Sequence, residues 1–208
     1  MTIEEALALQ QRYYPPRKPI SFSWGDVAFC RRLFRELFCG ADATAVPFRM
    51  LPEYEEVVEW MADTEGKGLL LWGDCGRGKT VILTGVVPVL LSERCGGRVP
   101  VCRAEELERK QHEVRSSGQE LETVLEVLKF TRYPIIDDVG TEPKINRYYG
   151  EKYEGFSSVV SAAEAAMKPL FVSTNLTPVE LNARYGTRTL DRLGRLCKAV
   201  HFKGESLR

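Results

Sequence analysis

The sequence predicts an α/β fold in which helices cover both faces of a parallel sheet. From Gly68 onward, short apolar segments typical of buried strands alternate with segments of helical periodicity. One of these strands runs into a glycine-rich loop, residues 73–80, which opens a helix. Before Gly68 the pattern is helical throughout. We therefore expect a small helical N-terminal region, residues 1–64, followed by one α/β domain, residues 65–208.

Size and composition restrict the classes of protein that the chain can belong to. With 208 residues, 44% of them hydrophobic, it can build one well-buried core but not two full-sized domains. Lysine and arginine total 29 and aspartate and glutamate total 29, so no overall positive field attracts nucleic acid. Any contact with DNA must come from a local patch.

Cysteine and histidine usage argues against a zinc module, because the six cysteines form no C-x-x-C pair and the two histidines are far apart. The first ten residues lack the pattern of a secretory signal, and no apolar window is long enough to cross a bilayer. We expect a cytoplasmic protein with reduced thiols and no membrane partner.

Two helices are predicted in the N-terminal region after a short first helix. Residues 23–38 start with a possible capping pair, Ser23 and Asp26, and place five apolar side chains on one face: Phe29, Leu33, Phe34, Leu37 and Phe38. Pro52 fits the first turn of a second helix, which presents Tyr54, Val57, Val58 and Met61 on one side.

The remaining elements alternate along the chain. Strands are predicted at residues 69–72, 98–102, 134–137 and 170–173, and helices at residues 79–93, 119–130, 155–167, 178–184 and 188–196. Residues 113–119 and 141–152 are expected to form loops.

The loop at residues 73–80 matches the phosphate-binding pattern G-x-x-x-x-G-K-[ST] in full. Its candidate nucleotide-binding residues are Gly73, Asp74, Cys75, Gly76, Arg77, Gly78, Lys79 and Thr80. The glycines let backbone N–H groups and the start of the helix point at a phosphate, while Lys79 reaches the β- and γ-phosphates and Thr80 ligates Mg²⁺. A chance glycine-rich turn is the alternative, but the position between a strand and a helix favours the phosphate site.

A second set of polar residues follows the strand at residues 134–137. Asp137 would hold the metal ion and Asp138 would polarise the attacking water, although paired acids can also be a solvated strand end. A further predicted strand around Val101 lies between the two motifs. This order favours the branch of phosphate-loop proteins that hydrolyse nucleotide to drive motion, and the absence of an N-K-x-D motif disfavours a GTPase.

Asn175 stands at the polar tip of the strand at residues 170–173. It can contact the γ-phosphate or orient the water, or it can cap the next helix. Thr177 can supply that cap alone, which favours the first role.

Arginines recur at helical spacing near the end of the chain, at Arg188, Arg192 and Arg195. They form either a solvated helix face or a face from which one arginine reaches the nucleotide of a neighbouring subunit. The basic stretch of residues 184–208 can equally serve DNA or subunit contacts.

Four of these motifs together resemble the AAA+ ATPases of the DnaC/DnaI helicase-loader and IstB transposition-helper group. They are GDCGRGKT, IIDDVG, STN and the terminal YGTRTLDRL…HFKGESLR, and the resemblance spans roughly residues 65–208. It implies a P-loop NTPase fold of the AAA+ type, a three-layer sandwich. The resemblance also assigns roles: Walker A for Lys79 and Thr80, Walker B for Asp137 and Asp138, sensor I for Asn175, the trans-acting arginine for Arg192 or alternatively Arg188, and a nucleotide-facing terminal arginine for Arg208.

The resemblance further implies ATP and Mg²⁺ as cofactors and a slow ATPase stimulated by assembly. Expected partners are a replicative helicase or a transposase, single-stranded or duplex DNA, and further copies of the chain in a nucleotide-dependent homo-oligomer. Position 138 is aspartate where many AAA+ enzymes have glutamate, and residues 1–64 resemble neither the helicase-binding nor the DNA-binding region of the group. A helicase loader, a transposition helper and a nucleotide-gated interaction module with little turnover therefore stay open.

Overall fold

The computed structural model describes residues 1–13, 20–42, 47–107, 131–142, 146–148, 151–153 and 155–207. The helix expected at residues 119–130, the loop expected at residues 113–119 and Arg208 lie outside the described residues. No helix in the described ranges has the length and apolar character needed to cross a membrane.

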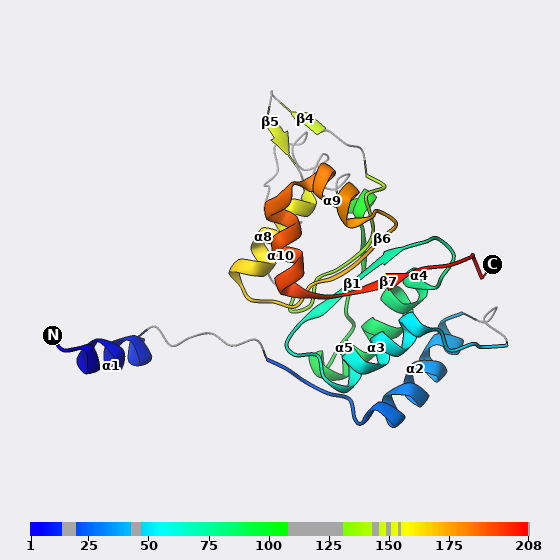
Figure 1. Cartoon of the computed structure of the whole chain (residues 1–208), viewed down its shortest axis with the longest axis horizontal. Coiled ribbons are helices and arrows are strands. Elements are labelled where there is room, and N and C mark those ends of the chain that lie inside the picture. The colour runs from blue at the N-terminus through cyan, green and yellow to red at the C-terminus, as the bar shows by residue number, and fades with distance from the viewer. Residues whose placement is uncertain are drawn as a thin grey trace.

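A five-stranded parallel sheet forms the centre of the molecule (Figure 1). In spatial order its strands are β2 (Cys102–Arg103), β3 (Ile135–Val139), β6 (Phe171–Thr174), β1 (Gly68–Gly73) and β7 (Cys197–Phe202). β6 therefore separates the strand that leads into the glycine-rich loop from the strand that contains the two aspartates. This architecture confirms the predicted α/β class with a parallel sheet.

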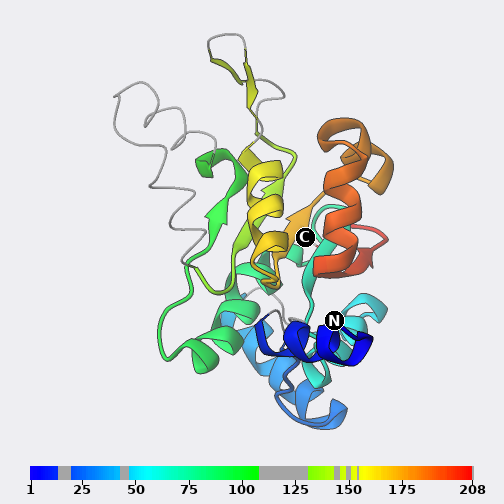
Figure 2. The same cartoon turned by 90° about the vertical axis from the view of Figure 1, so that its left-hand side faces the viewer.

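Helices cover both faces of the sheet (Figures 1 and 2). One layer contains α2 (Val27–Ala41), α3 (Pro52–Ala62), and a continuous helix made of α4 (Lys79–Val81), the π-helical turn η1 (Ile82–Val86) and α5 (Val87–Cys95). The opposite layer contains α8 (Gly155–Ala165), α9 (Pro178–Tyr185) and α10 (Thr187–Leu196). The remaining elements are α1 (Ile3–Tyr13) and an antiparallel pair, β4 (Asn146–Tyr148) and β5 (Glu151–Tyr153).

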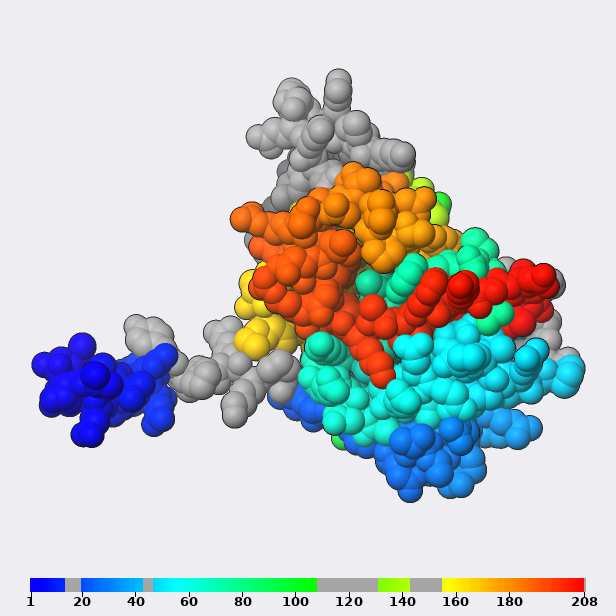
Figure 3. Space-filling view, in the orientation of Figure 1, coloured from blue at the N-terminus to red at the C-terminus, as the bar shows by residue number. Residues whose placement is uncertain are grey.

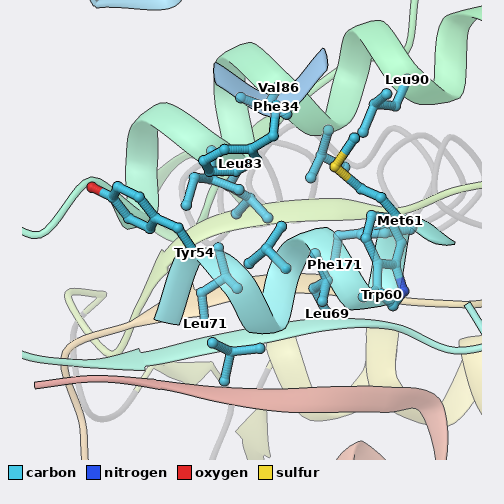
Figure 4. Packing of buried hydrophobic residues seen from close by; sticks show 14 of the residues in the cluster. Phe34, Tyr54, Trp60, Met61, Leu69, Leu71, Leu83, Val86, Leu90 and Phe171 are labelled. Carbon is cyan, nitrogen blue, oxygen red and sulfur yellow. The ribbon is translucent and has the colours of Figure 1, made fainter. Parts of the chain in front are cut away.

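Side-chain alternation along the strands divides the core into two clusters. Leu69 and Leu71 of β1 pack with α2, α3 and η1, whereas Leu70 packs with α8, α9 and α10. Figure 4 shows Trp60 of α3 near Leu69 of β1 and Phe171 of β6, and Phe34 of α2 beside Leu83 and Val86 of η1. The segment from α2 onward in the N-terminal region is therefore a layer of the main body, whereas α1 has no buried residue.

The starts of the helices follow local capping chemistry. α2 begins after Asp26, whose carboxylate accepts the backbone N–H of Phe29 at 2.7 Å, so the cap is Asp26 and not Ser23. Pro52 occupies the first turn of α3, as expected. The predicted helix at residues 79–93 exists with a π-helical turn, within which Gly85 lets Ala41 of α2 approach so closely that an added Cβ would lie 2.4 Å from it.

Three strand predictions differ from the structure. β2 contains only Cys102–Arg103, where a strand at residues 98–102 was expected. β7 was not predicted as a strand, and the expected loop at residues 141–152 contains β4 and part of β5. β7 lies at the sheet edge and mixes buried with accessible positions, a weaker signal than the apolar runs of the inner strands.

Candidate nucleotide-binding site

The glycine-rich loop leaves β1 at Gly73 and enters α4 at Lys79. Gly73, Gly76 and Gly78 have φ values of 116°, 69° and 85°. Residues other than glycine rarely adopt a backbone conformation with positive φ. The turn at Gly78 directly precedes the helix, so the first N–H groups of α4 face the loop. The sequence motif thus has the backbone that phosphate binding requires.

Lys79 lies inside this loop and is buried. Its Nζ donates to the carbonyl oxygens of Gly73 at 2.8 Å and Asp74 at 2.6 Å. Burial lowers the pKa of the Lys79 ammonium, an effect opposed by Cys75 and by nearby aspartates. A buried ammonium whose acceptors are neutral carbonyls is suited to an anionic ligand, because a phosphate supplies the negative charge that the carbonyls lack.

Asp137 lies within β3, and its carboxylate faces Thr80 at the start of α4. Its Oδ1 lies 3.4 Å from the hydroxyl of Thr80 and accepts a short hydrogen bond from Ser173. Burial raises the pKa of the Asp137 carboxyl, and the negative charge of Asp138 adds to this, while the hydrogen bonds from Ser173 and Thr80 oppose it. A carboxylate beside a hydroxyl is an oxygen donor set that fits Mg²⁺.

Asp138 has a φ of 56°, which places its backbone in the left-handed region. Its N–H donates to the hydroxyl of Ser173 at 3.0 Å, and its carbonyl accepts the Thr141 hydroxyl at 2.8 Å. The pairing of β3 with β6 shifts register between Ile136 and Val139, across this residue. The alternation of side chains between the two faces of β3 is therefore interrupted at Asp138. Its side chain does not continue the regular pattern of the strand.

Asn175 is exposed and follows β6 directly. The last residue of that strand, Thr174, is in register with Trp72 of β1 and with Val139 of β3. Asn175 therefore leaves the sheet between the phosphate loop and the acidic strand end. The cap of α9 is Thr177, which forms a reciprocal capping box with Glu180, so Asn175 is not needed for that purpose.

The two candidate arginines differ in their surroundings. Arg192 forms an ion pair with Glu164 of α8 and donates to the Ser161 hydroxyl, both at 2.5 Å. Arg188 is exposed, and within the described residues no ion pair involves it. Both lie on α10, in the helical layer opposite α3, and within the described residues neither forms a hydrogen bond or ion pair with the phosphate loop.

Sequence reasoning missed three residues that position the site. Ser173 bonds to both acids, and its only signal was its place at the polar strand tip. Glu53, in the first turn of α3, forms a buried ion pair with Arg77 of the loop. Glu142 is buried, accepts the N–H of Gly140 at 2.8 Å and pairs with Arg184 at 3.3 Å. Neither glutamate stands out in the sequence, because acids in a first helical turn or a loop are usually solvated.

The phosphate loop, the two acids and Asn175 thus meet at the carboxyl ends of three adjacent strands, which is where open parallel sheets bind ligands. The loop supplies a cation and backbone donors for a phosphate chain, and Thr80 and Asp137 supply oxygen ligands for a divalent ion. These features are those of a P-loop NTPase.

Comparison with known proteins finds solved structures with a similar architecture. No protein-family model matches the chain, and no curated protein matches its sequence. A structure of the DnaC helicase loader has a TM-score of 0.62 at 17% identity, over 80% of this chain and 98% of that one. A structure of DnaI has a TM-score of 0.60 at 18% identity, over 83% and 94% of the two chains. AMPPCP-bound DnaA from Aquifex aeolicus has a TM-score of 0.53 at 17% identity, over 66% of this chain and 40% of that one.

These neighbours are AAA+ helicase loaders and initiators, so the resemblance to the DnaC and DnaI group is confirmed at the level of the fold. At identities of 17–18% the likeness identifies the architecture only. The activity has to be argued from the residues of the site.

Proposed function

We propose that the chain is an ATP-binding and ATP-hydrolysing AAA+ protein of DNA replication that acts as a helicase loader and assembles on DNA. The observation that carries the proposal is the meeting of Lys79, Thr80 and Asp137 at the carboxyl edge of a sheet with the strand order described above. The DnaC-like fold, which covers 98% of the chain in that loader structure, supports the choice of a loader.

In this proposal each group of the site has one task. Lys79 and the loop N–H groups hold the phosphates, and Thr80 and Asp137 hold Mg²⁺, which supplies charge neutralisation at the phosphates. Asp138 polarises the attacking water, and Asn175 orients it or contacts the γ-phosphate. Ser173 keeps the two acids in place through its bonds to both.

Hydrolysis is completed by an arginine of a neighbouring copy, with Arg192 as the first candidate and Arg188 as the second. Arg192 must exchange Glu164 for the neighbour's phosphates, which is feasible because its side chain is 24% exposed. Turnover by a single copy is then slow, and assembly stimulates it. Loss of the γ-phosphate removes the anchor of the arginine and loosens the assembly.

The experiment that tests this function measures particle mass and ATP hydrolysis together, with Mg²⁺, with and without single-stranded DNA. We expect wild type to form a larger particle with ATP and to hydrolyse it faster in that particle. Lys79→Ala is expected to lose both properties, and Lys67→Ala, at the opposite end of the same strand, to keep them. Mass and rate that do not respond to ATP, or a Lys79→Ala variant equal to wild type, would contradict the proposal.

A second candidate function is a nucleotide-gated interaction module with little turnover. The left-handed backbone and short carboxylate of Asp138 favour it, because both restrict the reach of this acid towards a water. The two functions differ in the fate of the nucleotide. ATP that stays intact for hours in the assembled particle supports the module, whereas release of phosphate supports the ATPase.

The loader and a transposition helper differ only in the partner. Capture by a purified replicative helicase in the presence of ATP supports the loader. Capture by a transposase, with no retention by the helicase, supports the helper. Binding to DNA that falls steeply with salt would indicate phosphate contacts.

A further inference from the structure

We propose that Arg77, although it lies in the phosphate loop, positions this loop instead of binding nucleotide, and that it couples nucleotide occupancy to α3 and to the C-terminal segment, residues 203–207. This inference rests on the proposed ATP site. It assigns a role to the pair of Glu53 and Arg77, to which the sequence motif gives none.

The Arg77 guanidinium forms its hydrogen bonds with α3 and with the C-terminal segment. Its Nε donates to Glu53 Oε1 at 2.8 Å, and its Nη2 forms a second, shorter bond to the same oxygen. Both side chains are nearly inaccessible to water, with 10% of the arginine and 5% of the glutamate exposed. A guanidinium already neutralised by a buried carboxylate is a poor phosphate ligand, because binding phosphate would leave Glu53 as an unpaired buried charge.

α3 holds the loop at a second point beside this pair. The hydroxyl of Tyr54, the next residue of α3, donates to the backbone carbonyl of Arg77 at 3.0 Å. An added Cβ at Gly78 would lie 2.7 Å from the same hydroxyl and 2.9 Å from the Phe38 ring of α2. The N-terminal helices therefore form a close-fitting outer wall for the loop.

The C-terminal segment packs against the phosphate loop as well. Arg77 Nη1 donates to the carbonyl of Glu205 at 3.2 Å, and the Leu207 N–H donates to the carbonyl of Gly76 at 3.0 Å. An added Cβ at Gly76 would lie 2.1 Å from the Ser206 hydroxyl. Figure 3 shows the red end of the chain, β7 followed by this segment, crossing the surface between the orange and the cyan parts of the molecule. One guanidinium thus holds three separate parts of the chain together.

Asp74 connects this arrangement to the phosphate-binding lysine. Its carbonyl accepts Lys79 Nζ, its carboxylate accepts the N–H of Gly204 at 2.8 Å, and its N–H donates to the carbonyl of Phe202 at 2.8 Å. A phosphate chain that binds Lys79 competes with the first of these bonds and so alters the residue that holds the start of the C-terminal segment. The Arg77 contacts then transmit the change to Glu205 and to α3.

Coupling of this kind is reciprocal: whatever the docked segment adds to nucleotide affinity, nucleotide adds to docking of the segment. The test therefore measures both sides on the full-length chain. ATP affinity is measured by calorimetry with Mg²⁺. Docking is measured by hydrogen exchange of the Gly204 and Leu207 amides, with and without ATP.

Two substitutions and their combination separate the roles. Glu53→Gln and Arg77→Met each remove one charge, and the combined variant removes both and so avoids an unpaired buried charge. Glu55→Gln is the matched control, because Glu55 lies on the same helix but pairs with the exposed Arg31 at 2.8 Å. Unfolding in urea confirms that the combined variant and the control fold cooperatively.

We expect the combined variant to bind ATP about tenfold more weakly and to exchange the two amides faster by a similar factor. We also expect it to lose the difference in exchange between samples with and without ATP, which a merely structural contact would not abolish. Glu53→Gln alone should show the same direction of change, and Glu55→Gln should behave as wild type.

Three results would overturn the inference. Unchanged affinity and exchange in the combined variant would remove the positioning role. Weaker binding in Arg77→Met but not in Glu53→Gln would mean that Arg77 contacts the nucleotide directly. A wild-type chain that binds no ATP would overturn the proposed function and the coupling with it, and this failure is distinguishable because amide exchange without ATP reports the contacts separately.

Discussion

Two arginine–glutamate pairs of the molecule differ in their access to water. The pair of Arg77 and Glu53, beside the phosphate loop, is 10% and 5% exposed. The pair of Arg192 and Glu164, between α10 and α8, is 24% and 27% exposed, and Glu164 is shared with Arg195. A buried pair cannot separate without leaving an uncompensated charge, whereas a partly solvated one can exchange partners. The first is suited to fix a loop, and the second to release an arginine towards a neighbouring subunit.

The largest expected effect concerns the exchangeable arginine. In Arg192→Ala, assembly-stimulated ATP hydrolysis should fall by about 10³-fold or more, because the charge that stabilises the transition state is lost. ATP binding to the single copy should stay unchanged. The measurement is the hydrolysis rate against protein concentration.

Two further arginines serve as controls for this prediction. Arg195→Ala, which removes the other partner of Glu164, should leave the rate near that of wild type. If Arg188→Ala loses the stimulated rate and Arg192→Ala keeps it, Arg188 is the trans-acting arginine.

The second prediction compares the stability of the two pairs. Glu53→Ala should lower the free energy of unfolding by about 3–5 kcal/mol, because it leaves Arg77 buried without its partner. Glu164→Ala should lower it by at most about 1 kcal/mol, because water solvates the released arginines. Urea unfolding followed by circular dichroism measures both, and equal losses would remove the distinction between the pairs.

The third prediction concerns the pH dependence of the metal site. A protonated Asp137 cannot ligate Mg²⁺, and burial raises its pKa, so Mg²⁺-dependent ATP binding should weaken at a higher pH than for an exposed aspartate. Without Mg²⁺, the same raised pKa contributes stability at low pH that is lost as the pH rises through it. Titration of ATP affinity against pH in wild type and Asp137→Asn tests this, and a variant with the wild-type pH profile would rule out Asp137 as the titrating group.

The smallest expected effect is a loss of stability at the start of α9, where the capping residues Thr177 and Glu180 are exposed to solvent. Thr177→Ala removes the hydroxyl that accepts the Glu180 N–H at 3.2 Å and donates to the Glu180 carboxylate at 2.8 Å, and should cost about 1 kcal/mol of unfolding free energy. Thr187→Ala, in the first turn of α10 where no side-chain cap exists, is the control and should change stability little. If Thr177→Ala lowers the free energy of unfolding as much as Glu53→Ala does, the exposed capping box contributes as much to stability as the buried ion pair, which would contradict this ranking.

Features formed by residues close together in the sequence were predictable from the sequence. The phosphate loop is defined by glycines and a lysine at fixed spacing, and the acidic strand end by an apolar run before Asp137. Both signals are local because the backbone of a few residues makes the turn or the strand. The same holds for Thr177, whose capping partner Glu180 lies three positions away.

Contacts between distant segments were not predictable in this way. Glu53 and Arg77 are partners only because α3 packs on the sheet beside the loop, and a single sequence carries no mark of that pairing. β7 was missed because only three of its residues, Cys197, Val200 and Phe202, are buried, and its run also includes Lys198 and His201. The pairing of Arg192 with Glu164 of the same chain depends on the packing of α10 against α8. Helical spacing alone does not specify that packing.

The most direct test of the central claim is the binding of ATP with Mg²⁺ to the purified full-length chain, measured by calorimetry. We predict saturable binding of one ATP per chain in wild type, with none detectable in Lys79→Ala and unchanged binding in Lys67→Ala. Absence of binding in wild type, or equal binding in Lys79→Ala, would contradict the assignment of this strand edge as a nucleotide site.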